Sequence, residues 1–212
     1  MNSLVSDAQD LFKHSSIIAG IDEAGRGPLA GPVCAAAVIL PSDFPFEILR
    51  DSKKLSQKKR EFAEAIIKEK ACFGIALVDN KKIDEINILQ ATMLAMRTAF
   101  EDLLKKLPSW CSIRNINCDL ENICVIVDGN KKPLSSENCV CVPKADAKYF
   151  QVMAASILAK TCRDRIMIEM DKKYPQYGYA RHKGYPTSEH RKICRQIGPS
   201  PIQRLTFSYQ KP

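Results

Sequence analysis

Short apolar runs alternate with longer amphipathic stretches along this chain of 212 residues, and the alternation limits the folds that it can adopt. Apolar runs bounded by turn residues predict five buried strands, at residues 17–21, 33–40, 71–78, 123–127 and 140–142. The longest run, 33–40, has eight residues, whereas a helix that crosses a bilayer needs about 20. With 45% hydrophobic and 26% charged residues, the composition is that of a globular protein and excludes disordered, collagen-like and coiled-coil chains.

The stretches between these runs predict helices. Ser56 can cap a helix whose apolar residues fall on one face, namely Phe62, Ala63, Ile66 and Ile67. Apolar residues recur every three or four positions over 83–107, which predicts a long amphipathic helix, and another helix is expected over 152–170. Thr187 can cap a last helix that ends near Gly198. Strands separated by helices predict an α/β fold, in which helices cover a mixed or parallel sheet.

The nine cysteines show no spacing typical of a metal site. They form no Cys-x-x-Cys pair, and Cys139-x-Cys141 alone cannot supply the paired spacings of a zinc site. The N-terminus has neither the basic start nor the apolar stretch of a signal peptide, so we expect a cytoplasmic chain. In that reducing compartment the cysteines are expected to be small buried apolar residues rather than disulfides.

Positive charge and tyrosine are concentrated in residues 172–212. This segment contains nine Lys and Arg residues, one acidic residue and five of the six tyrosines, whereas residues 1–171 have no net charge. Basic groups interleaved with aromatic rings favour a nucleic acid partner, whose phosphates attract the charges and whose bases or sugars stack on the rings. A solvated tail would carry the same charge, but it would gain nothing from exposed tyrosines.

A glycine-rich loop follows the first predicted strand, with the sequence Asp22-Glu23-Ala24-Gly25-Arg26-Gly27-Pro28-Leu29-Ala30-Gly31-Pro32. Gly-x-Gly after a strand also occurs in dinucleotide-binding folds. Here Pro28 and the adjacent carboxylates disfavour that interpretation, because the carboxylates would repel a pyrophosphate. Carboxylates at the end of a strand instead indicate a site for hard divalent cations, which prefer oxygen ligands.

Two further acids occupy similar places in the sequence. Asp128 follows the strand predicted at 123–127, and Asp146 lies shortly after the strand predicted at 140–142. If these strands are neighbours, both acids meet Asp22 and Glu23 at one end of the sheet. Their mutual repulsion would raise their pKa values, and bound Mg²⁺ or Mn²⁺ would relieve it. Two such ions about 4 Å apart can hydrolyse phosphodiesters. A single acid at a strand end is usually a turn residue or a helix cap, so the prediction depends on the whole set.

The loop and several further motifs resemble the bacterial ribonuclease HII family. Residues 22–33 are similar to the signature of that family, and further motifs follow in the family's order: Asp51-Ser52-Lys53-Lys54-Leu55, Val127-Asp128-Gly129, Lys144-Ala145-Asp146-Ala147-Lys148, Ala155-Ser156-Ile157-Leu158-Ala159-Lys160, Arg163-Asp164 and His182-Lys183-Gly184-Tyr185-Pro186-Thr187. The resemblance extends from residue 17 to residue 207. A continuous match of this length, followed by ordered motifs, is highly specific.

The resemblance implies a ribonuclease H-like α/β fold with a central five-stranded mixed sheet flanked by helices. We expect a single domain over residues 1–212, with an α/β core at 17–171 and a basic, aromatic-rich, helical substrate-binding region at 172–212. The implied activity is that of an endoribonuclease that hydrolyses the RNA strand of RNA–DNA hybrids and cuts 5′ of single ribonucleotides in duplex DNA. Its products would carry 5′-phosphate and 3′-hydroxyl ends. We expect a monomer that does not bind membranes.

The resemblance also implies roles for individual residues. The catalytic and metal-binding acids of the family, which would hold two Mg²⁺ or Mn²⁺ ions, correspond to Asp22, Glu23, Asp128 and Asp146. The loop that would hold the 2′-hydroxyl of the ribonucleotide and the adjoining phosphate corresponds to Gly25, Arg26 and Gly27. Tyr185 would contact that hydroxyl and stack on the following deoxyribose, and Lys53 and Lys54 would neutralise phosphates. The 2′-hydroxyl is the group by which a protein distinguishes RNA from DNA at one position.

Two other functions remain open at this point. A type HIII-like ribonuclease would need several consecutive ribonucleotides, but such enzymes lack the arginine that corresponds to Arg26 and carry an extra N-terminal domain. A non-catalytic module that binds hybrids is the second alternative, and the presence of all four acids argues against it.

Three further positions carry expectations that the structure can test. Ala145 stands where many members of the family have glycine, and its methyl group matters only if the backbone there has a positive φ. Asp164 lies four residues after Lys160 on a predicted helix, which favours a structural ion pair. His182 and His190 lie in the basic segment, and we expect them either to contact phosphates or to be exposed.

Overall fold

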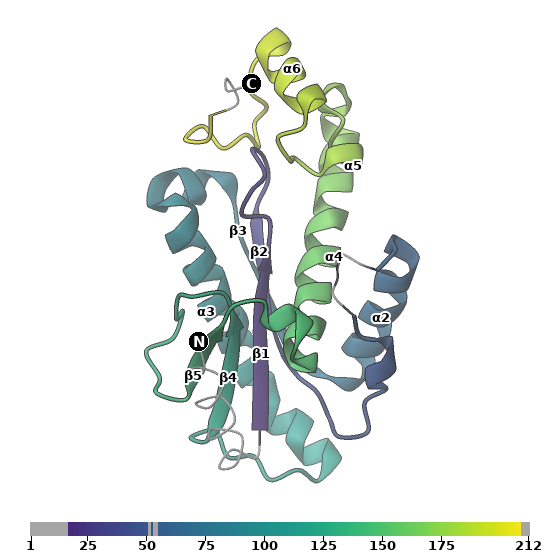
Figure 1. The fold of residues 1–212 in the computed structure, drawn as a ribbon, viewed down its shortest axis with the longest axis vertical. Helices are drawn as coiled ribbons and strands as arrows, with labels where there is room; N and C mark the ends of the chain where they lie inside the picture. The colour runs from purple at the N-terminus through teal and green to yellow at the C-terminus, as the bar shows by residue number, and fades with distance from the viewer. Residues whose placement is uncertain (1–16, 51, 53–54, 209–212) are drawn as a thin grey trace.

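The computed structural model describes residues 17–50, 52 and 55–208. Within them, five strands form one sheet in the order β3-β2-β1-β4-β5 (Figure 1). The strands are β1 (Ile17–Ala24), β2 (Val33–Ile39), β3 (Cys72–Val78), β4 (Ile123–Asp128) and β5 (Cys139–Val142). β2 is antiparallel to β1 and β3, whereas β4 is parallel to β1 and β5 is parallel to β4. The predicted mixed sheet and all five of its predicted strands are confirmed.

β1 lies at the centre of the sheet, and its carboxyl end positions the first acids. Ile21 of β1 pairs with Val127 of β4 in parallel register. The next residue of each strand is an acid, Asp22 in β1 and Asp128 in β4. These two acids therefore lie near the carboxyl ends of neighbouring parallel strands, at the same end of the sheet. β1 is longer than the predicted run 17–21, because its pairing with β2 continues as far as Ala24.

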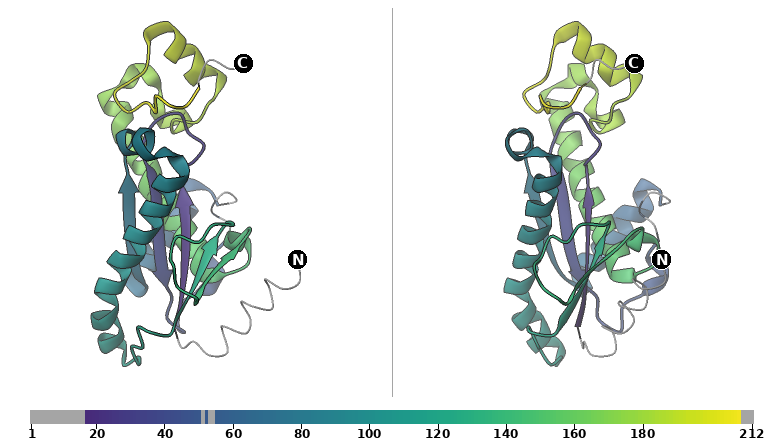
Figure 2. Two further views of the ribbon diagram at one scale, coloured as in Figure 1. Left: turned by 90° about the vertical axis from the view of Figure 1, so that its left-hand side faces the viewer. Right: turned by 60° about the vertical axis from the view of Figure 1, so that its left-hand side comes forward.

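Helices cover both faces of the sheet (Figure 2). α3 (Asn80–Arg114) packs on one face, and α4 (Phe150–Lys173) with α2 (Gln57–Lys70) covers the other. Two glycines allow this close packing. A Cβ atom at Gly20 would lie 2.3 Å from the backbone of Gln151 in α4, and one at Gly74 would lie 2.0 Å from the carbonyl oxygen of Ala99 in α3. Neither position admits a side chain, so both glycines set the distance between sheet and helix.

The long helix predicted over 83–107 is present but interrupted. α3 contains Asn87 with φ 65° and ψ 164°, a conformation outside the helical region. The Oδ1 atom of Asn87 accepts hydrogen bonds from the N–H groups of Leu89 (3.0 Å) and Gln90 (3.1 Å), so it caps the second part of the helix. Apolar residues on both sides of the break pack in the same core, which is why spacing alone predicts one helix.

The predicted caps of two other helices are confirmed. The hydroxyl of Ser56 accepts from the N–H of Lys59 at the start of α2, and that of Thr187 accepts from the N–H of His190 at the start of α6 (Ser188–Ile197). Phe62 does not share the predicted apolar face of α2, since it is 61% exposed. It lies about 100° around the helix from Ala63, which does pack in the core.

The C-terminal region lies at one end of the elongated molecule, where α4 extends beyond the sheet (Figure 1). It contains η3 (Pro175–Tyr177), α5 (Tyr179–His182) and α6, while two other short helical turns, η1 (Phe46–Ile48) and η2 (Ala145–Ala147), belong to the core. A small apolar cluster that includes Ala30, Met167, Tyr177 and Tyr179 attaches the region to α4 and to the glycine-rich loop. The expectation that its tyrosines serve for stacking is therefore wrong for Tyr177 and Tyr179, which are buried.

His182 and His190 are also buried, so neither phosphate contact nor exposure describes them. Their rings stack with centroids 4.4 Å apart. Nδ1 of His182 accepts from the N–H of Gly184 (3.1 Å), and its Nε2 donates to the carbonyl oxygen of Tyr177 (2.9 Å). Because the backbone occupies both ring nitrogens, His182 serves the fold rather than a ligand.

All nine cysteines are free, and six of them are buried as predicted, whereas Cys118, Cys141 and Cys162 are partly exposed. In the described part of the chain, no helix combines the length and the apolar character needed to cross a membrane.

Candidate active site

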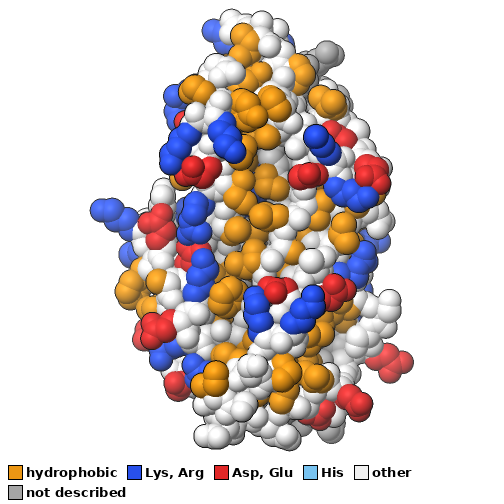
Figure 3. Space-filling view, turned by 180° about the vertical axis from the view of Figure 1, so that it is seen from behind, with side chains coloured by type: hydrophobic (Ala, Val, Ile, Leu, Met, Phe, Trp, Pro, Cys, Tyr) orange, Lys and Arg blue, Asp and Glu red, His pale blue; other side chains and the backbone are white. Residues whose placement is uncertain are grey.

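Two cavities of similar volume differ in their chemistry. The first, of about 490 Å³, lies between β3, α3 and α4 and is lined mainly by apolar residues, among them Leu77, Leu94 and Met170. Hydrophobic side chains also gather along the middle of the rear surface of the molecule (Figure 3). The second cavity, of about 500 Å³, lies at the carboxyl ends of β1 and β4. It contains most of the site residues predicted from the sequence: Asp22, Glu23, Gly25, Arg26, Gly27, Asp128 and Tyr185.

Three carboxylates meet at this end of the sheet. One oxygen from each of Asp22, Asp128 and Asp146 lies within 4.8 Å of the others. Asp22 belongs to β1, Asp128 ends β4, and Asp146 lies in η2 after β5. The parallel pairing of β1 with β4 and of β4 with β5 brings the ends of these strands together, which is the condition on which the predicted site depended.

Burial and like charge make this cluster unfavourable without a cation. The pKa of Asp22 is raised well above its ordinary value, first by burial and then by the charges of Glu23 and Asp128. The pKa of Glu23 is also raised, mainly by burial, although the Arg26 guanidinium acts in the opposite direction. A cation held among these oxygens would offset both costs.

Backbone N–H groups orient two of the acids. Asp22 accepts from the N–H of Glu23 at 2.7 Å, and Asp128 accepts from the N–H of Ala145 at 2.7 Å. The hydrogen bond from Ala145 to Asp128 thereby links β4 to the turn that carries Asp146. The positive φ of that turn, 58°, falls on Lys144 and not on Ala145. Alanine in place of glycine at position 145 therefore introduces no backbone strain.

Glu23 lies beside the cluster of three aspartates rather than within it. Its Oε1 atom is 3.2 Å from Nη1 of Arg26, in the loop that follows β1. The sequence predicted four acids around one site, and the structure brings three of them together, with Glu23 on the wall of the same cavity. The ion pair connects this wall to the Gly-Arg-Gly loop.

The two glycines of this loop lack side chains for different reasons. Gly25 has a φ of +100°, and a Cβ atom there would lie 2.1 Å from Nε of Arg163, so the fold itself requires glycine. At Gly27 the nearest atom to a Cβ would be Cε1 of Tyr185, at 3.8 Å. The protein leaves the space beside Gly27 open, and a ligand in the cavity can approach the backbone there.

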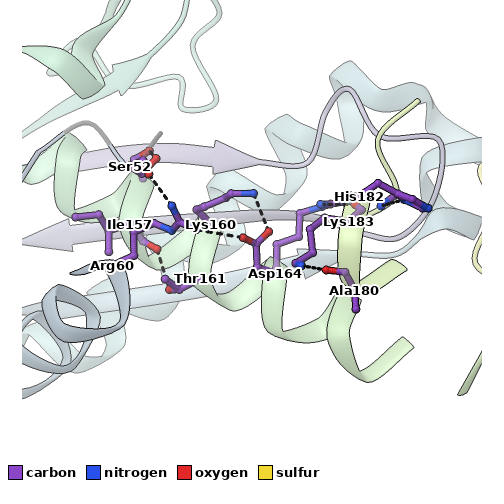
Figure 4. A network of polar contacts seen from close by, with 12 residues as sticks. Ser52, Arg60, Ile157, Lys160, Thr161, Asp164, Ala180, His182 and Lys183 are labelled. Carbon is purple, nitrogen blue, oxygen red and sulfur yellow. Dashed lines mark hydrogen bonds and ion pairs between the residues drawn. The ribbon is translucent and has the colours of Figure 1, made fainter. Parts of the chain in front are cut away.

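Four polar or charged residues that were not predicted as site residues also line this cavity: Ser52, Arg60, Ser156 and Lys160. The hydroxyls of Ser52 and Ser156 are 2.8 Å apart. Lys160 donates to Asp164 at 2.7 Å, which confirms the predicted ion pair (Figure 4). Lys53 and Lys54 lie outside the described residues.

Arg60 has the weakest sequence signal of the four. It follows Lys58 and Lys59 at the start of α2, in a run that is typical of a solvated helix surface. In the structure its Nη1 donates to the carbonyl oxygens of Ser52 (3.1 Å) and Leu55 (2.6 Å). Only the packing of α2 beside α4 reveals its place at the cavity.

The donor set of the cluster fits a hard divalent cation. Mg²⁺ and Mn²⁺ prefer carboxylate oxygens, and three such groups within 4.8 Å can share one or more ions. Asp22, Asp128 and Asp146 are the residues that would hold them.

A mixed sheet in this strand order, with acids at the carboxyl ends of its parallel strands, defines the ribonuclease H-like class of nucleases. The model of the family described as ribonuclease HII matches residues 19–210. A ribonuclease HII from Treponema denticola is 53% identical over 196 residues, which cover 90% of this chain and 98% of that protein. The chain belongs to the ribonuclease HII family.

Solved structures agree with this fold. The crystal structure of ribonuclease H2 from Pyrococcus horikoshii OT3 aligns with a TM-score of 0.63 and 28% identity, over 91% of this chain and 94% of that one. A structure of Bst-RNase HIII in complex with Mn²⁺ aligns with a TM-score of 0.69 and 21% identity, over 98% of this chain and 71% of that one. Both types share the fold, so the sequence rather than the fold distinguishes type HII from type HIII.

Proposed function

We propose that this chain is a divalent-metal-dependent endoribonuclease that cuts 5′ of single ribonucleotides in duplex DNA and hydrolyses the RNA strand of RNA–DNA hybrids. One observation carries the proposal. Asp22 and Asp128, which form a cluster with Asp146, line the same cavity as the Gly-Arg-Gly loop and Tyr185. A member of the ribonuclease HII family thus has acids for phosphodiester chemistry beside a backbone that a sugar can approach.

The acids and the loop have separate tasks in this proposal. Asp22, Asp128 and Asp146, with Glu23 beside them, would hold two Mg²⁺ or Mn²⁺ ions. Such ions supply an activated water and stabilise the leaving oxygen in phosphodiester hydrolysis. Attack on phosphorus breaks its bond to the 3′ oxygen, which leaves a 3′-hydroxyl on one fragment and a 5′-phosphate on the ribonucleotide.

Recognition of the ribonucleotide would fall to the loop and to Tyr185. The N–H groups near Gly27 can donate to the 2′-hydroxyl and to the adjoining phosphate. Tyr185, which is 41% exposed and lines the same cavity next to Gly27, can stack on the next sugar. Lys53, Lys54 and the basic C-terminal region over 172–212 would neutralise phosphates further along the duplex.

The proposal needs only one copy of the chain. The described residues of the acid cluster, the loop and the tyrosine come together within one chain, so we propose a single catalytic domain that needs no second copy to complete its site and acts as a monomer. Because its substrate would be chromosomal nucleic acid and its relative is bacterial, we place its action in the cytoplasm.

A labelled duplex that contains one ribonucleotide tests this function. With Mg²⁺ or Mn²⁺ we expect one cut, on the 5′ side of the ribonucleotide, and no cut in EDTA. Asp22→Asn should reduce the rate at least about 10³-fold, because it removes a ligand charge that the reaction requires. Asp102→Asn is the matched control, since Asp102 forms an exposed ion pair with Lys106 on α3.

The same substrate distinguishes the alternatives. A type HIII-like enzyme would leave the single ribonucleotide intact and cut a run of several. A non-catalytic module would bind the hybrid and cut neither duplex, with or without metal. Either result would refute the proposed activity.

A further inference from the structure

The guanidinium of Arg204 is buried beneath the Gly-Arg-Gly loop, although its sequence position placed it in the basic segment predicted to bind nucleic acid. Arg204 is 0% exposed. It donates four hydrogen bonds to backbone carbonyl oxygens of the loop: from Nε to Gly31 (2.9 Å), from Nη1 to Arg26 (3.0 Å) and Pro28 (2.8 Å), and from Nη2 to Gly25 (2.6 Å). A cation that is removed from water requires such a set of acceptors.

These bonds fix the direction of the peptide groups in the loop. In a trans peptide the C=O and the following N–H point in opposite directions. Since the carbonyl groups of Gly25 and Arg26 point toward Arg204, the N–H groups of Arg26 and Gly27 point away from it. Both residues line the cavity that contains the acid cluster.

The peptide group between Pro28 and Leu29 has the same orientation, and its N–H has a protein acceptor. The carbonyl of Pro28 accepts from Arg204, and the N–H of Leu29, in the same peptide group, donates to the carbonyl oxygen of Gly184 at 2.8 Å. Gly184 precedes Tyr185, so this peptide joins the loop to the tyrosine. Within the described residues, no protein acceptor is recorded for the N–H groups of Arg26 and Gly27.

The segment that carries Arg204 is itself fixed to the rest of the molecule. Its own N–H donates to the carbonyl oxygen of Leu29 at 2.8 Å. Asp84 of α3 accepts from the N–H groups of Leu205 (2.8 Å) and Thr206 (3.0 Å). The guanidinium thus connects α3 to the loop through the C-terminal segment.

Arg163 of α4 makes a comparable set of contacts from the other side. It is 1% exposed and donates to the carbonyl oxygens of Ala30 (3.1 Å), Pro32 (2.9 Å) and Lys183 (3.0 Å). It therefore ties the end of the loop to the residues before Tyr185. Arg204 alone contacts the carbonyls of Gly25 and Arg26, whose peptide groups face the cavity.

We propose that Arg204 is a positioning residue for ribonucleotide recognition, because it orients the N–H groups of Arg26 and Gly27 toward the substrate from beneath the loop. The inference rests on the proposed function. Lysine cannot replace arginine here, since a single ammonium lacks the planar fork that reaches several carbonyl groups at once. The preference for ribose over deoxyribose therefore depends on a residue that does not touch the substrate.

Binding measurements with Ca²⁺ in place of the catalytic metal test this role. We would compare a duplex that contains one ribonucleotide with the identical all-DNA duplex, for the unmodified chain, Arg204→Lys and Arg204→Gln. In both variants we expect the ratio of the affinity for the ribonucleotide duplex to the affinity for the all-DNA duplex to fall at least about tenfold, a change of about 1.4 kcal/mol. Their affinity for all-DNA duplex should change less than about twofold, and Arg97→Gln on α3 should change neither.

The outcomes separate positioning from a general structural role. A variant that is folded by circular dichroism and keeps the preference overturns the proposal, and so does an equal loss of affinity for both duplexes. If neither Arg204 variant folds, Asp84→Ala provides the second test, because it loosens the same segment without leaving a buried cavity. An unchanged preference in Asp84→Ala also overturns the proposal. Failure of the unmodified chain to prefer or cut the ribonucleotide duplex would instead count against the proposed function.

Discussion

At the scale of single residues, Asp22 combines a proposed catalytic role with a cost to folding. It is 5% exposed and lies near two other acids. Because its folded pKa is raised above the unfolded value of 3.8, the folded ion-free chain binds more protons than the unfolded one between these pKa values. The stability of the ion-free chain therefore falls as the pH rises through that range.

Asp22→Asn should consequently stabilise the ion-free protein at pH 7. We expect the variant to melt at a higher temperature than the unmodified chain in EDTA, because the buried and repelled charge is removed. Mg²⁺ should raise the melting temperature of the unmodified chain and not that of the variant. Thermal melts in EDTA and in Mg²⁺ measure both effects. A variant that melts lower than the unmodified chain in EDTA would contradict the electrostatic account of Asp22.

The two glycines of the Gly-Arg-Gly loop allow a matched pair of predictions. Gly25→Ala should destabilise the fold by about 1–3 kcal/mol, because it meets Arg163 and requires a left-handed backbone. Gly27→Ala should leave stability within about 0.5 kcal/mol, but it should weaken cutting at a single ribonucleotide at least about tenfold, since the methyl group occupies the space proposed for the sugar. Chemical denaturation and cleavage rates test both. Equal loss of stability in both variants would contradict this assignment of the open space.

Residues whose roles depend on their neighbours in the sequence could be predicted. Asp22 and Asp128 directly follow predicted strands, so they were expected to meet if those strands were neighbours. Arg204 could not be predicted, because its partners lie more than 170 residues earlier in the chain. A formal charge in a basic segment gives no information about burial, so Arg204 was counted among the basic residues predicted to bind nucleic acid.

At the scale of structural elements, the C-terminal region is a packed unit rather than a charged extension. Tyr179 is fully buried, and its ring lies edge-on to both His182 and His190. The hydrophobic pattern did not reveal this small core, because tyrosine and histidine are also common on nucleic-acid-binding surfaces. The break of α3 at Asn87 escaped prediction for a similar reason, since the apolar residues keep their spacing across it.

The buried histidine pair makes this region sensitive to acid. Burial lowers the pKa of His182 and His190, whereas an unfolded histidine titrates near about 6.5. As the pH falls below that value, the unfolded chain takes up protons that the folded chain excludes, so stability decreases by up to about 1.4 kcal/mol per pH unit for each histidine.

Urea denaturation at pH 7.5, 6.5 and 5.5 measures this dependence. His190→Gln should reduce the pH slope, because the variant has one buried titrating group fewer. An unchanged pH slope in the variant, whatever its absolute stability, would show that protonation of His190 is not coupled to unfolding.

At the scale of the whole molecule, the sheet and the C-terminal region together form the candidate active site. The sheet supplies the acids from the ends of β1 and β4 and from the turn after β5, while α4 extends from the sheet to the region that holds Tyr185. Arg163 and Arg204 connect the two through the glycine-rich loop. The residues proposed for catalysis and those proposed for recognition thus lie where the sheet joins the C-terminal region.

Crystals grown with Mn²⁺, examined by anomalous scattering, test the central claim most directly. The account predicts Mn²⁺ bound to the carboxylate oxygens of Asp22, Asp128 and Asp146, and none there in Asp22→Asn crystals grown in the same way. Mn²⁺ bound only elsewhere in the unmodified protein, or these three side chains turned away from one another without an ion, would contradict it.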